Sequence, residues 1–494
     1  MTWATLPSKS RAMIDLRPVG YVIGLLVAAL GVTMLVPMLV DLGLGTGHAG
    51  VFLESAILTT LTGGLMALAC ANAVTGKLNV QQIFLIATGV WAVLPIFGAI
   101  PFIQGATQST ITDAYFEAMS GLTTTGSTVL TGLDDLPGGL LLWRSMLQWF
   151  GGIGIIVVAM AFLPELRVGG MQIFRSEAFD TDGKVLPRAA EIASRISIVY
   201  LGLTVICILT YVASGFTFFN SVNHALTTIS TGGFSTHDAS FGEYQGAPEY
   251  VAAVFMVLAS LPFVRYVQLL AGTVQPLWKD SQIRVFLALN VLLIVAVTLY
   301  RLIANGDHFF HALREASFNV TSIITGTGYA SVDYQLWGAF PVALFFFMGL
   351  VGGCAGSTCC SVKVFRYQIV VIAIMNQIRR IHSPHGVFQP KYAGRTLTED
   401  VISSVTAFMT MFFVTLGILA VLLSATGLDF VTAVSGAATA IANVGPGLGD
   451  IIGPAGNFST LNDPAKWILI VGMLMGRLEL MVVFVLFTSR FWRS

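Results

Sequence analysis

The segment TTTGST, at residues 123–128, decides the organisation of this chain, because the sequence repeats it three more times in altered form. The later copies are STGGFS at 230–235, TGTGYAS at 325–331 and NVGPGLG at 443–449. Each copy is a short polar segment that lies between two long apolar stretches. Four such segments between membrane spans predict a pore lined by four quasi-equivalent loops.

The composition is that of an integral membrane protein. Of the 494 residues, 55% are hydrophobic and 10% are charged, with a formal net charge of +0 and a mean hydropathy of +0.82. Soluble globular domains carry about 25% charged residues. The cysteines lie in or beside apolar stretches without metal-ligand spacing, which favours a packing role: Cys70, Cys207, Cys354, Cys359 and Cys360.

Apolar runs of about twenty residues, the length that crosses a bilayer, predict ten spanning helices. The first two form a hairpin at 18–41 and 51–73, and the others frame the polar loops in pairs: 83–104 with 138–163, 194–215 with 248–271, 284–304 with 337–374, and 401–425 with 464–489. We therefore expect an all-α polytopic membrane protein with four pore units. Its expected domains are the hairpin at 1–80 and pore units at 81–172, 173–275, 276–380 and 381–494.

Short segments inside each unit, such as ITDAYFEAMSG at 111–121, are too short and polar to cross the membrane. They predict half-length helices that enter the membrane and return. Non-helical backbone at membrane depth is tolerated only where it faces protein or water. The four loops must therefore share an aqueous path.

Positive charge predicts the orientation. With Met1 in the cytoplasm, most of the 25 lysine and arginine residues fall in cytoplasmic segments, as the positive-inside rule requires. Both termini are then cytoplasmic, and all four polar loops lie on the outer side. The longest cytoplasmic segments, 164–193 and 375–400, are too small for a catalytic domain. The first is interpreted either as a solvated loop or as a docking site for a soluble partner.

The loops have the chemistry of a cation filter. Backbone carbonyls replace the water shell of an alkali ion without full charges, so the ion can still leave, and glycine permits the backbone angles that aim successive carbonyls at one axis. One Thr-Gly pair is an ordinary turn, but four at matched positions predict a selectivity filter. Its expected residues are Thr124, Thr125, Gly126, Ser230, Thr231, Gly232, Thr325, Gly326, Thr327, Gly328, Asn443, Val444 and Gly445.

The segments SGLTTTGST, TTISTGGFST, TSIITGTGYAS and TAIANVGPGLG resemble the filter loops of the TrkH/KtrB/HKT superfamily of potassium transporters. The stretches at 143–157 and 348–358 also resemble TrkH segments, and the N-terminal hairpin favours the TrkH branch. The resemblance implies equivalent positions for Gly126, Gly232, Gly328 and Gly445. In the plant branch, serine at the first of these goes with sodium preference, so four glycines imply potassium.

The same resemblance implies partners and a location. It implies a homodimer in the bacterial inner membrane and a cytosolic TrkA-type regulatory subunit that binds ATP, ADP or NAD(H). No organic cofactor on this chain and no nucleic-acid partner are expected. Two departures from the Thr-Gly pattern are notable. The fourth loop reads Asn443-Val444-Gly445-Pro446, and Asn-x-Gly-Pro is usual there in the family, whereas Gly326 stands where threonine or serine is more common and is expected to loosen the wall.

Arg477 lies in the last predicted span, where a charge costs several kcal/mol unless it faces water or a partner. One interpretation is a packing arginine paired with Glu479, although residues two apart on a helix do not face each other. The resemblance places Arg477 in the pore under the filter, where it would repel cations and limit flux.

The stretch MGLVGGCAGSTCCSVKVFR, at 348–366, is rich in glycine, which disfavours a helix by about 1 kcal/mol per residue. Tight packing through small residues is one interpretation. The resemblance implies an intramembrane loop that obstructs the pore and moves on gating, made stiffer here by Cys359-Cys360-Ser361. Lys363 and Arg366 would contact a partner or lipid headgroups. The expected gate residues are Gly349, Gly352, Gly353, Gly356, Ser357, Thr358 and Lys363.

Two other functions fit less well. A transporter that couples potassium to sodium or protons usually keeps a carboxylate at mid-membrane, and Glu54 and Glu479 are the clearest acidic residues within the spans. A membrane enzyme would need convergent titratable groups, but most histidines lie at loops without a shared face: His224, His237, His308, His311, His382 and His385.

Overall fold

The computed structural model describes residues 14–73, 78–161, 169–171 and 185–493. These residues form an all-helical, multi-span membrane fold with one small antiparallel hairpin, β1 (Lys391–Tyr392) and β2 (Arg395–Thr396). Most of the segment 164–193, interpreted above as a solvated loop or docking site, lies outside the described residues.

Seven stretches of the described chain are long and apolar enough to cross a membrane, and they match seven of the ten predicted spans. Their helices are α1 (Arg17–Thr33) with α2 (Leu35–Leu44), α3 (Ala49–Cys70), α4 (Val80–Gly98) with α5 (Ile100–Gln104), α7 (Gly138–Ala161), α10 (Val185–Ala213), α15 (Ser281–Tyr300) and α19 (Glu399–Ala425).

The other three predicted spans are broken. The first is α12 (Ala247–Ala259) and α13 (Phe263–Leu270), bent by 88° and followed by α14 (Gln275–Lys279). The second is α17 (Ala339–Gly349) and α18 (Val364–His382), where a glycine-rich break was predicted. The third is α21 (Asp463–Arg477) and α22 (Met481–Leu486). Continuous helices were therefore the wrong prediction for the first and third.

The first and third breaks are visible in the backbone. Pro262 caps the start of α13 and cannot donate a backbone hydrogen bond to the preceding turn, so α12 ends before it. Between α21 and α22, Glu479 and Leu480 have left-handed backbone angles, with φ +60° and +44°. Neither conformation can continue a right-handed helix.

Four short helices precede the polar loops, as predicted: α6 (Ile111–Leu122), α11 (Phe218–Ile229), α16 (Phe309–Ile324) and α20 (Phe430–Ala442). Thr110, Thr217 and Asp429 start three of them by accepting a backbone N–H with the side chain. All four helices end where a polar loop begins, so the partial negative charge of each C-terminus is directed at the loops.

The short helices are packed in a closed cycle. Each one packs on a helix that follows or precedes a different polar loop: α6 on α21, α11 on α7, α16 on α12, and α20 on α17. The first short helix therefore meets the last long segment of the chain, which closes the cycle.

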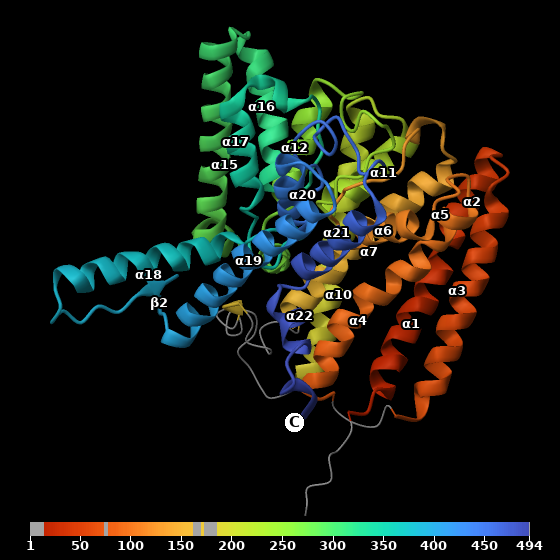
Figure 1. The fold of residues 1–494 in the computed structure, drawn as a ribbon, viewed down its shortest axis with the longest axis horizontal. Coiled ribbons are helices and arrows are strands. Elements are labelled where there is room, and N and C mark those ends of the chain that lie inside the picture. Colours follow the sequence, from red (N-terminus) through yellow and green to blue (C-terminus); the bar gives the residue numbers. More distant parts are fainter. Residues whose placement is uncertain (1–13, 74–77, 162–168, 172–184, 494) are drawn as a thin grey trace, which may run out of the picture.

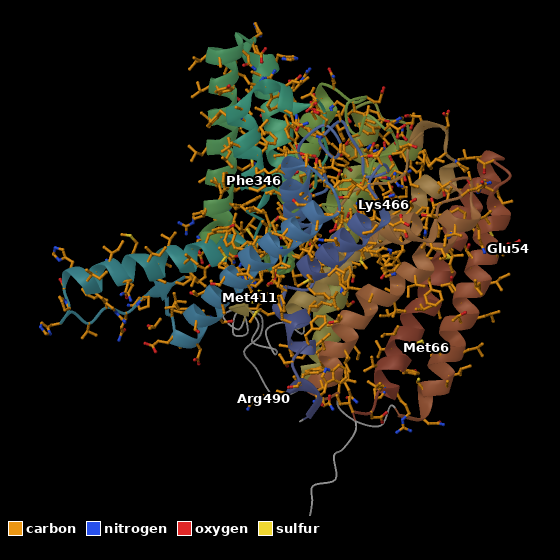
Figure 2. The ribbon with its side chains drawn as sticks, in the orientation of Figure 1. Glu54, Met66, Phe346, Met411, Lys466 and Arg490 are labelled. Atoms are coloured by element: carbon orange, nitrogen blue, oxygen red, sulfur yellow. The ribbon has the colours of Figure 1, made fainter. Side chains whose placement is uncertain are left out.

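The remaining helices lie outside this cycle. In Figure 1, α1 and α3 pack at one side of the molecule and α18 projects from the other. Small residues bring α1 and α3 together, since a Cβ on Gly63 would lie 2.3 Å from the backbone nitrogen of Ala28. Figure 2 shows Glu54 at the outer edge of the molecule on α3, where its side chain is exposed.

Candidate functional site

The four polar loops share one backbone conformation. Each has two residues with positive φ, separated by a single residue. In the first position φ is +51° at Thr124, +51° at Thr231, +70° at Gly326 and +51° at Asn443; in the second it is +89° at Gly126, +79° at Gly233, +81° at Gly328 and +109° at Gly445. The residue between them, in each loop, donates its N–H to the carbonyl five residues earlier: Thr125 to Ser120, Gly232 to Thr227, Thr327 to Ser322 and Val444 to Thr439.

This shared pattern corrects the alignment of the second loop. Gly232 was expected to be equivalent to Gly126, but Gly233 is the residue with positive φ, whereas Gly232 matches Thr125 in its hydrogen bond. The four equivalent glycines are therefore Gly126, Gly233, Gly328 and Gly445. Because Gly232 and Gly233 are adjacent, the sequence alone could not show which of them is equivalent to Gly126.

These glycines close the loops into a ring. A Cβ at Gly126 would lie 2.3 Å from the carbonyl oxygen of Gly232, and one at Gly233 would lie 1.9 Å from that of Thr327. A Cβ at Gly328 would lie 1.9 Å from the oxygen of Val444, and one at Gly445 would lie 2.9 Å from that of Thr125. Each loop thus rests against a backbone carbonyl of the next, and the fourth rests against the first. A side chain at any of these positions would displace a carbonyl.

The first left-handed position accepts side chains. A Cβ at Gly326 would meet nothing closer than 3.6 Å, an ordinary contact. Threonine occupies the same conformation in the first two loops, at the cost of strain that glycine avoids. Gly326 therefore has the same backbone conformation as its counterparts, and the structure gives no sign of the looser wall that we expected.

Side chains brace the loops from behind. The hydroxyls of Thr123 and Thr125 lie 2.7 Å apart, and those of Thr325 and Thr327 lie 2.8 Å apart. Ser230 donates its hydroxyl to the carbonyl of Thr227, at 3.2 Å. These bonds hold the polar side chains of the loops in fixed positions.

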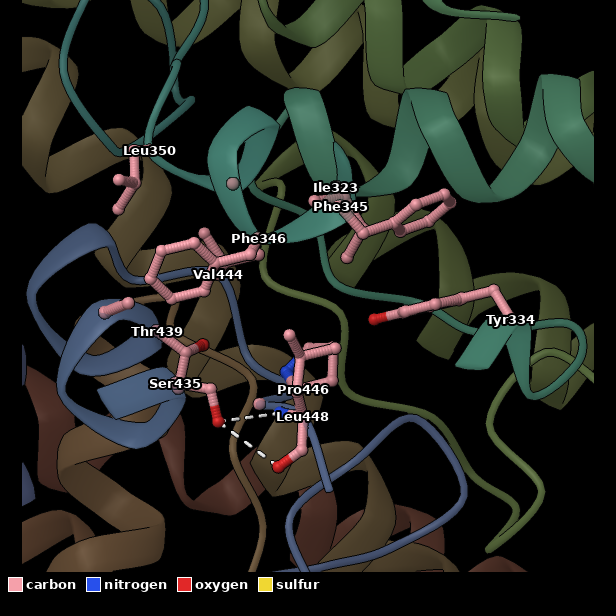
Figure 3. A pocket seen from close by; sticks show the side chains of 13 residues that line it. Ile323, Tyr334, Phe345, Phe346, Leu350, Ser435, Thr439, Val444, Pro446 and Leu448 are labelled. Atoms are coloured by element: carbon pink, nitrogen blue, oxygen red, sulfur yellow. Dashed lines mark hydrogen bonds between the residues drawn. The ribbon is translucent and has the colours of Figure 1, made fainter. Parts of the chain in front are cut away.

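The fourth loop is braced differently. Asn443 donates its side-chain amide to the hydroxyl of Thr125 and to the carbonyl of Met473, both at 2.9 Å. Val444 and Phe346 line a small cavity of about 30 Å³ beside this loop. Figure 3 shows the hydroxyl of Ser435 in this cavity, hydrogen-bonded to the backbone of Leu448. Asparagine tolerates the left-handed conformation better than most residues, so this loop keeps the common backbone without the Thr-Gly sequence.

A vestibule of about 550 Å³ lies over the ring, and its lining includes all four equivalent glycines. Two carboxylates, Asp238 and Asp450, line it together with Arg144, whose charge is paired with Glu117, so the net charge of the lining favours cations. Asp238 accepts N–H groups of the neighbouring loop, at 2.9 Å from Gly132. His237 forms a hydrogen bond with Asp134 that holds the pKa of that carboxyl below its ordinary value.

On the other side of the ring lies the loop between α17 and α18, residues 350–363. The thiol of Cys360 is 3.5 Å from the hydroxyl of Thr124 in the first polar loop. Ser361 donates its N–H to the carbonyl of Ala442, at the end of α20, at 2.9 Å. A Cβ on Gly352 would lie 2.0 Å from the carbonyl oxygen of Cys360. The loop is therefore folded tightly against the inner face of the ring.

The loop is also fastened to the break between α12 and α13. Cys354 donates its N–H to the carbonyl of Ser260 at 3.0 Å, and the carbonyl of Gly356 accepts the N–H of Phe263 at 2.9 Å. Backbone groups freed by a broken helix must find partners inside the membrane. The two irregular segments satisfy each other.

Arg477 reaches the same loop from the end of α21. Its Nη1 lies 2.6 Å from the thiol of Cys360 and 3.5 Å from the carbonyl of Thr358, and its Nη2 donates to the carbonyl of Gly151 at 2.9 Å. The guanidinium also lies 5.4 Å from the ring centre of Trp91. A positive charge is thus held directly beneath the ring by the intramembrane loop and by α7.

The family follows from comparison with known proteins. A family model described as TrkH, cation transport protein, matches residues 48–494. The chain belongs to the TrkH family. It is 46% identical over 420 residues to the Trk system potassium uptake protein TrkI of Halomonas elongata, with 85% of each chain covered.

The family match extends to a solved structure. Over 486 residues the chain is 37% identical to the Trk system potassium uptake protein TrkH of Vibrio parahaemolyticus, covering 97% of this chain and 99% of the relative. The crystal structure of the potassium transporter TrkH from that organism matches with a TM-score of 0.90 at 35% identity, covering 97% of this chain and 100% of that one. The expectation of a transport protein rather than an enzyme is confirmed.

One contact of this TrkH family member was missed at the sequence level. Glu479 forms an ion pair with buried Arg366, which also donates to the carbonyl of Gly169 at 3.0 Å and lies 3.8 Å from the ring centre of Phe408. The expectation that Arg366 meets a partner or lipid headgroups is therefore wrong. The spacing of two residues indicated that Glu479 and Arg477 would not pair, and they do not. Arg366 and Glu479 are 113 residues apart, and only the fold brings them together.

The remaining predicted gate residues lie in or beside the loop. Gly349 ends α17, and its carbonyl accepts the hydroxyl of Ser361 at 2.8 Å. Ser357 donates its hydroxyl to the carbonyl of Cys354 at 2.7 Å. A Cβ on Gly353 would lie 2.9 Å from the carbonyl of Ser260. Lys363 is buried at the start of α18 and donates to the carbonyl of Cys359, inside the loop.

Proposed function

We propose that this TrkH family member is a channel-like potassium uptake protein whose selectivity filter is the ring of four loops. The observation that carries the proposal is the cyclic closure, in which Gly126, Gly233, Gly328 and Gly445 each abut a carbonyl of a neighbouring loop. The Trk system relatives named above are potassium uptake proteins. The five domains expected from the sequence, a hairpin and four pseudo-symmetric pore units, remain part of this proposal.

The chemistry of the ring suits a weakly held monovalent cation. Its first left-handed residues are Thr124, Thr231, Gly326 and Asn443, so all four loops have the same backbone conformation at this level of the ring. Carbonyl dipoles can replace a water shell without binding the ion too tightly to leave. Four helix C-termini add partial negative charge at the same point.

In the proposed mechanism the intramembrane loop at 350–363 closes the pathway beneath the filter. Cys360 lies under Thr124, and Arg477 adds a positive charge to the obstruction. Opening requires the loop to leave the ring and the arginine to lose its contacts with it. The barrier is then both steric and electrostatic.

The proposal includes the assembly implied by the resemblance. Two copies of the chain form a homodimer in the bacterial inner membrane with cytoplasmic termini. A cytosolic TrkA-type subunit binds ATP, ADP or NAD(H) and transmits the signal to the loop. Coupled transport with sodium or protons has less support, because Glu54 is exposed at the periphery and Glu479 is paired with Arg366.

The test is uptake of rubidium against sodium by proteoliposomes that contain the purified chain. We expect wild type to prefer rubidium and Gly126→Ser to lose that preference, since a side chain there meets the carbonyl of Gly232. Gly132→Ser is the matched control, because Gly132 also has positive φ, +69°, but has open space around it. Equal uptake of the two ions by wild type refutes potassium selectivity.

A further inference from the structure

A large apolar cavity lies beside the proposed pathway, outside the ring. It has a volume of about 580 Å³ and is formed between α1, α4 and α7, with Leu26, Ala29, Ile86, Trp91 and Gly154 among its lining. Ligand-binding pockets are typically about 300–1,000 Å³. The cavity therefore has room for an organic ligand rather than a few waters.

The lining specifies an apolar ligand. No charged side chain lines the cavity within the described residues. Its two hydroxyls are already satisfied inside their own helices, since Thr33 donates to the carbonyl of Leu30 and Ser197 to that of Ala193, each at 2.7 Å. Water would find few partners there.

The dimensions match one hydrocarbon chain. The lining extends along α1 from Val22 to Thr33 and along α4 from Ile83 to Leu94, which is about 16 Å in each helix at 1.5 Å per residue. Half of a hydrocarbon core of about 30 Å is about 15 Å. The two helices are membrane spans, and Leu26 is 40% exposed at the edge of the cavity, so the cavity opens toward the bilayer.

Two residues of the inner cavity wall also contact Arg477. Gly151 and Trp91 both line the cavity. The carbonyl of Gly151 accepts a hydrogen bond from Arg477, and the Trp91 ring lies beneath its guanidinium. Leu122, the last residue of α6, lines the same wall. Anything that fills the cavity therefore packs against the groups that position Arg477 and the first polar loop.

We propose that this cavity binds one acyl chain of a membrane phospholipid, which packs against Trp91 and Gly154 and so steadies Arg477 beneath the ring. Acyl-chain occupancy is independent of the proposed function. Only its effect on ion flux rests on that function.

The experiment uses the full chain in proteoliposomes that contain a phosphatidylcholine with a diazirine in the middle of one acyl chain. After photolysis, the labelled peptides are mapped by mass spectrometry. We expect more label on the cavity-lining stretches 22–33 and 83–94 than on α3, whose Leu61, Leu65 and Leu68 are also exposed. Equal labelling of these surfaces would show ordinary boundary lipid and overturn the proposal.

A substitution that fills the cavity can be compared with a matched substitution outside it. Leu26→Trp should reduce label in these stretches by about tenfold, the effect of 1.4 kcal/mol of lost affinity. Leu25→Trp should not, because Leu25 is exposed on the same helix but does not line the cavity. Ile86→Trp fills the cavity from α4 and replaces Leu26→Trp if that variant does not fold. If a cavity-filling variant keeps the wild-type amount of label in these stretches, the proposal is overturned. If rubidium uptake fails while the labelling pattern holds, only the proposed transport function is rejected.

Discussion

Two glycines of the third loop provide the sharpest test of the ring. Gly326 and Gly328 are two residues apart, both have positive φ, +70° and +81°, and both can be replaced by alanine. A Cβ at Gly326 would have 3.6 Å to its nearest neighbour, whereas one at Gly328 would lie 1.9 Å from the carbonyl oxygen of Val444. The same substitution therefore tests backbone strain alone at the first site and carbonyl displacement at the second.

The strain is similar at the two sites, about 1–2 kcal/mol for a non-glycine residue in the left-handed region. At Gly328, the oxygen of Val444 must also move by 3.0−1.9=1.1 Å to reach the shortest contact that Cβ atoms normally show. That displacement removes one oxygen from the proposed ion site. With about 1.5–3 kcal/mol for a hydrogen bond to a charged group as a guide, selectivity should fall by roughly tenfold to a hundredfold.

The assay is the ratio of rubidium to sodium uptake by proteoliposomes, with melting temperature measured on the same preparations. We expect Gly326→Ala to keep the wild-type ratio and Gly328→Ala to lose it, although both are destabilised. If the two variants retain the same ratio, the carbonyl contact between Gly328 and Val444 does not set selectivity, and the proposed filter geometry is refuted.

Three further predictions follow from the contacts. Arg477→Ala removes charge-assisted bonds of about 1.5–3 kcal/mol each that join the guanidinium to the loop and to Gly151 of α7. Rubidium flux should therefore rise at least about tenfold, with Arg477→Lys between it and wild type; unchanged flux would exclude the barrier role. Gly352→Ala places a Cβ 2.0 Å from the carbonyl of Cys360 and should increase leak flux by displacing the loop, whereas normal flux would show that the loop does not obstruct the path. The hydrogen bond from His237 lowers the pKa of Asp134, so their pairing stabilises the fold above about pH 4 and this stabilisation is lost as pH falls through the lowered pKa. Asp134→Asn should therefore lower the melting temperature at pH 6 but not at pH values below the lowered pKa, and an equal effect at both would contradict this assignment.

Much of the architecture was predictable because it depends on local patterns. Apolar runs identified seven continuous spans, and the short polar helices were recognisable between them. The break between α12 and α13 was missed, although Pro262 carries the local signal for it. The break before α22 lies at Glu479 and Leu480, without a proline, and the partner of Glu479, Arg366, is 113 residues away in the sequence.

In the candidate site too, local patterns in the sequence were informative and contacts between distant residues were not predictable. In the first, third and fourth loops, the glycines expected to be equivalent have the same backbone handedness, at Gly126, Gly328 and Gly445. In the second loop, Gly232 and Gly233 are adjacent, and only the backbone hydrogen bonds distinguish them. The contact of Arg477 with Cys360 spans 117 residues and depends on the path of the intramembrane loop, which no periodicity encodes.

The cyclic closure also constrains how the protein is made. The hydroxyl of Ser127 donates to the carbonyl of Gly445, 318 residues later, and Asn443 reaches Thr125 over the same separation. A chain emerging from the ribosome in order can insert its early helices, but its first polar loop lacks its contacts with the fourth until translation is nearly complete. Domains generally fold as units during synthesis, and long-range pairings form late. Nascent chains that stop before Gly445 therefore lack the residues that close the ring around its first loop.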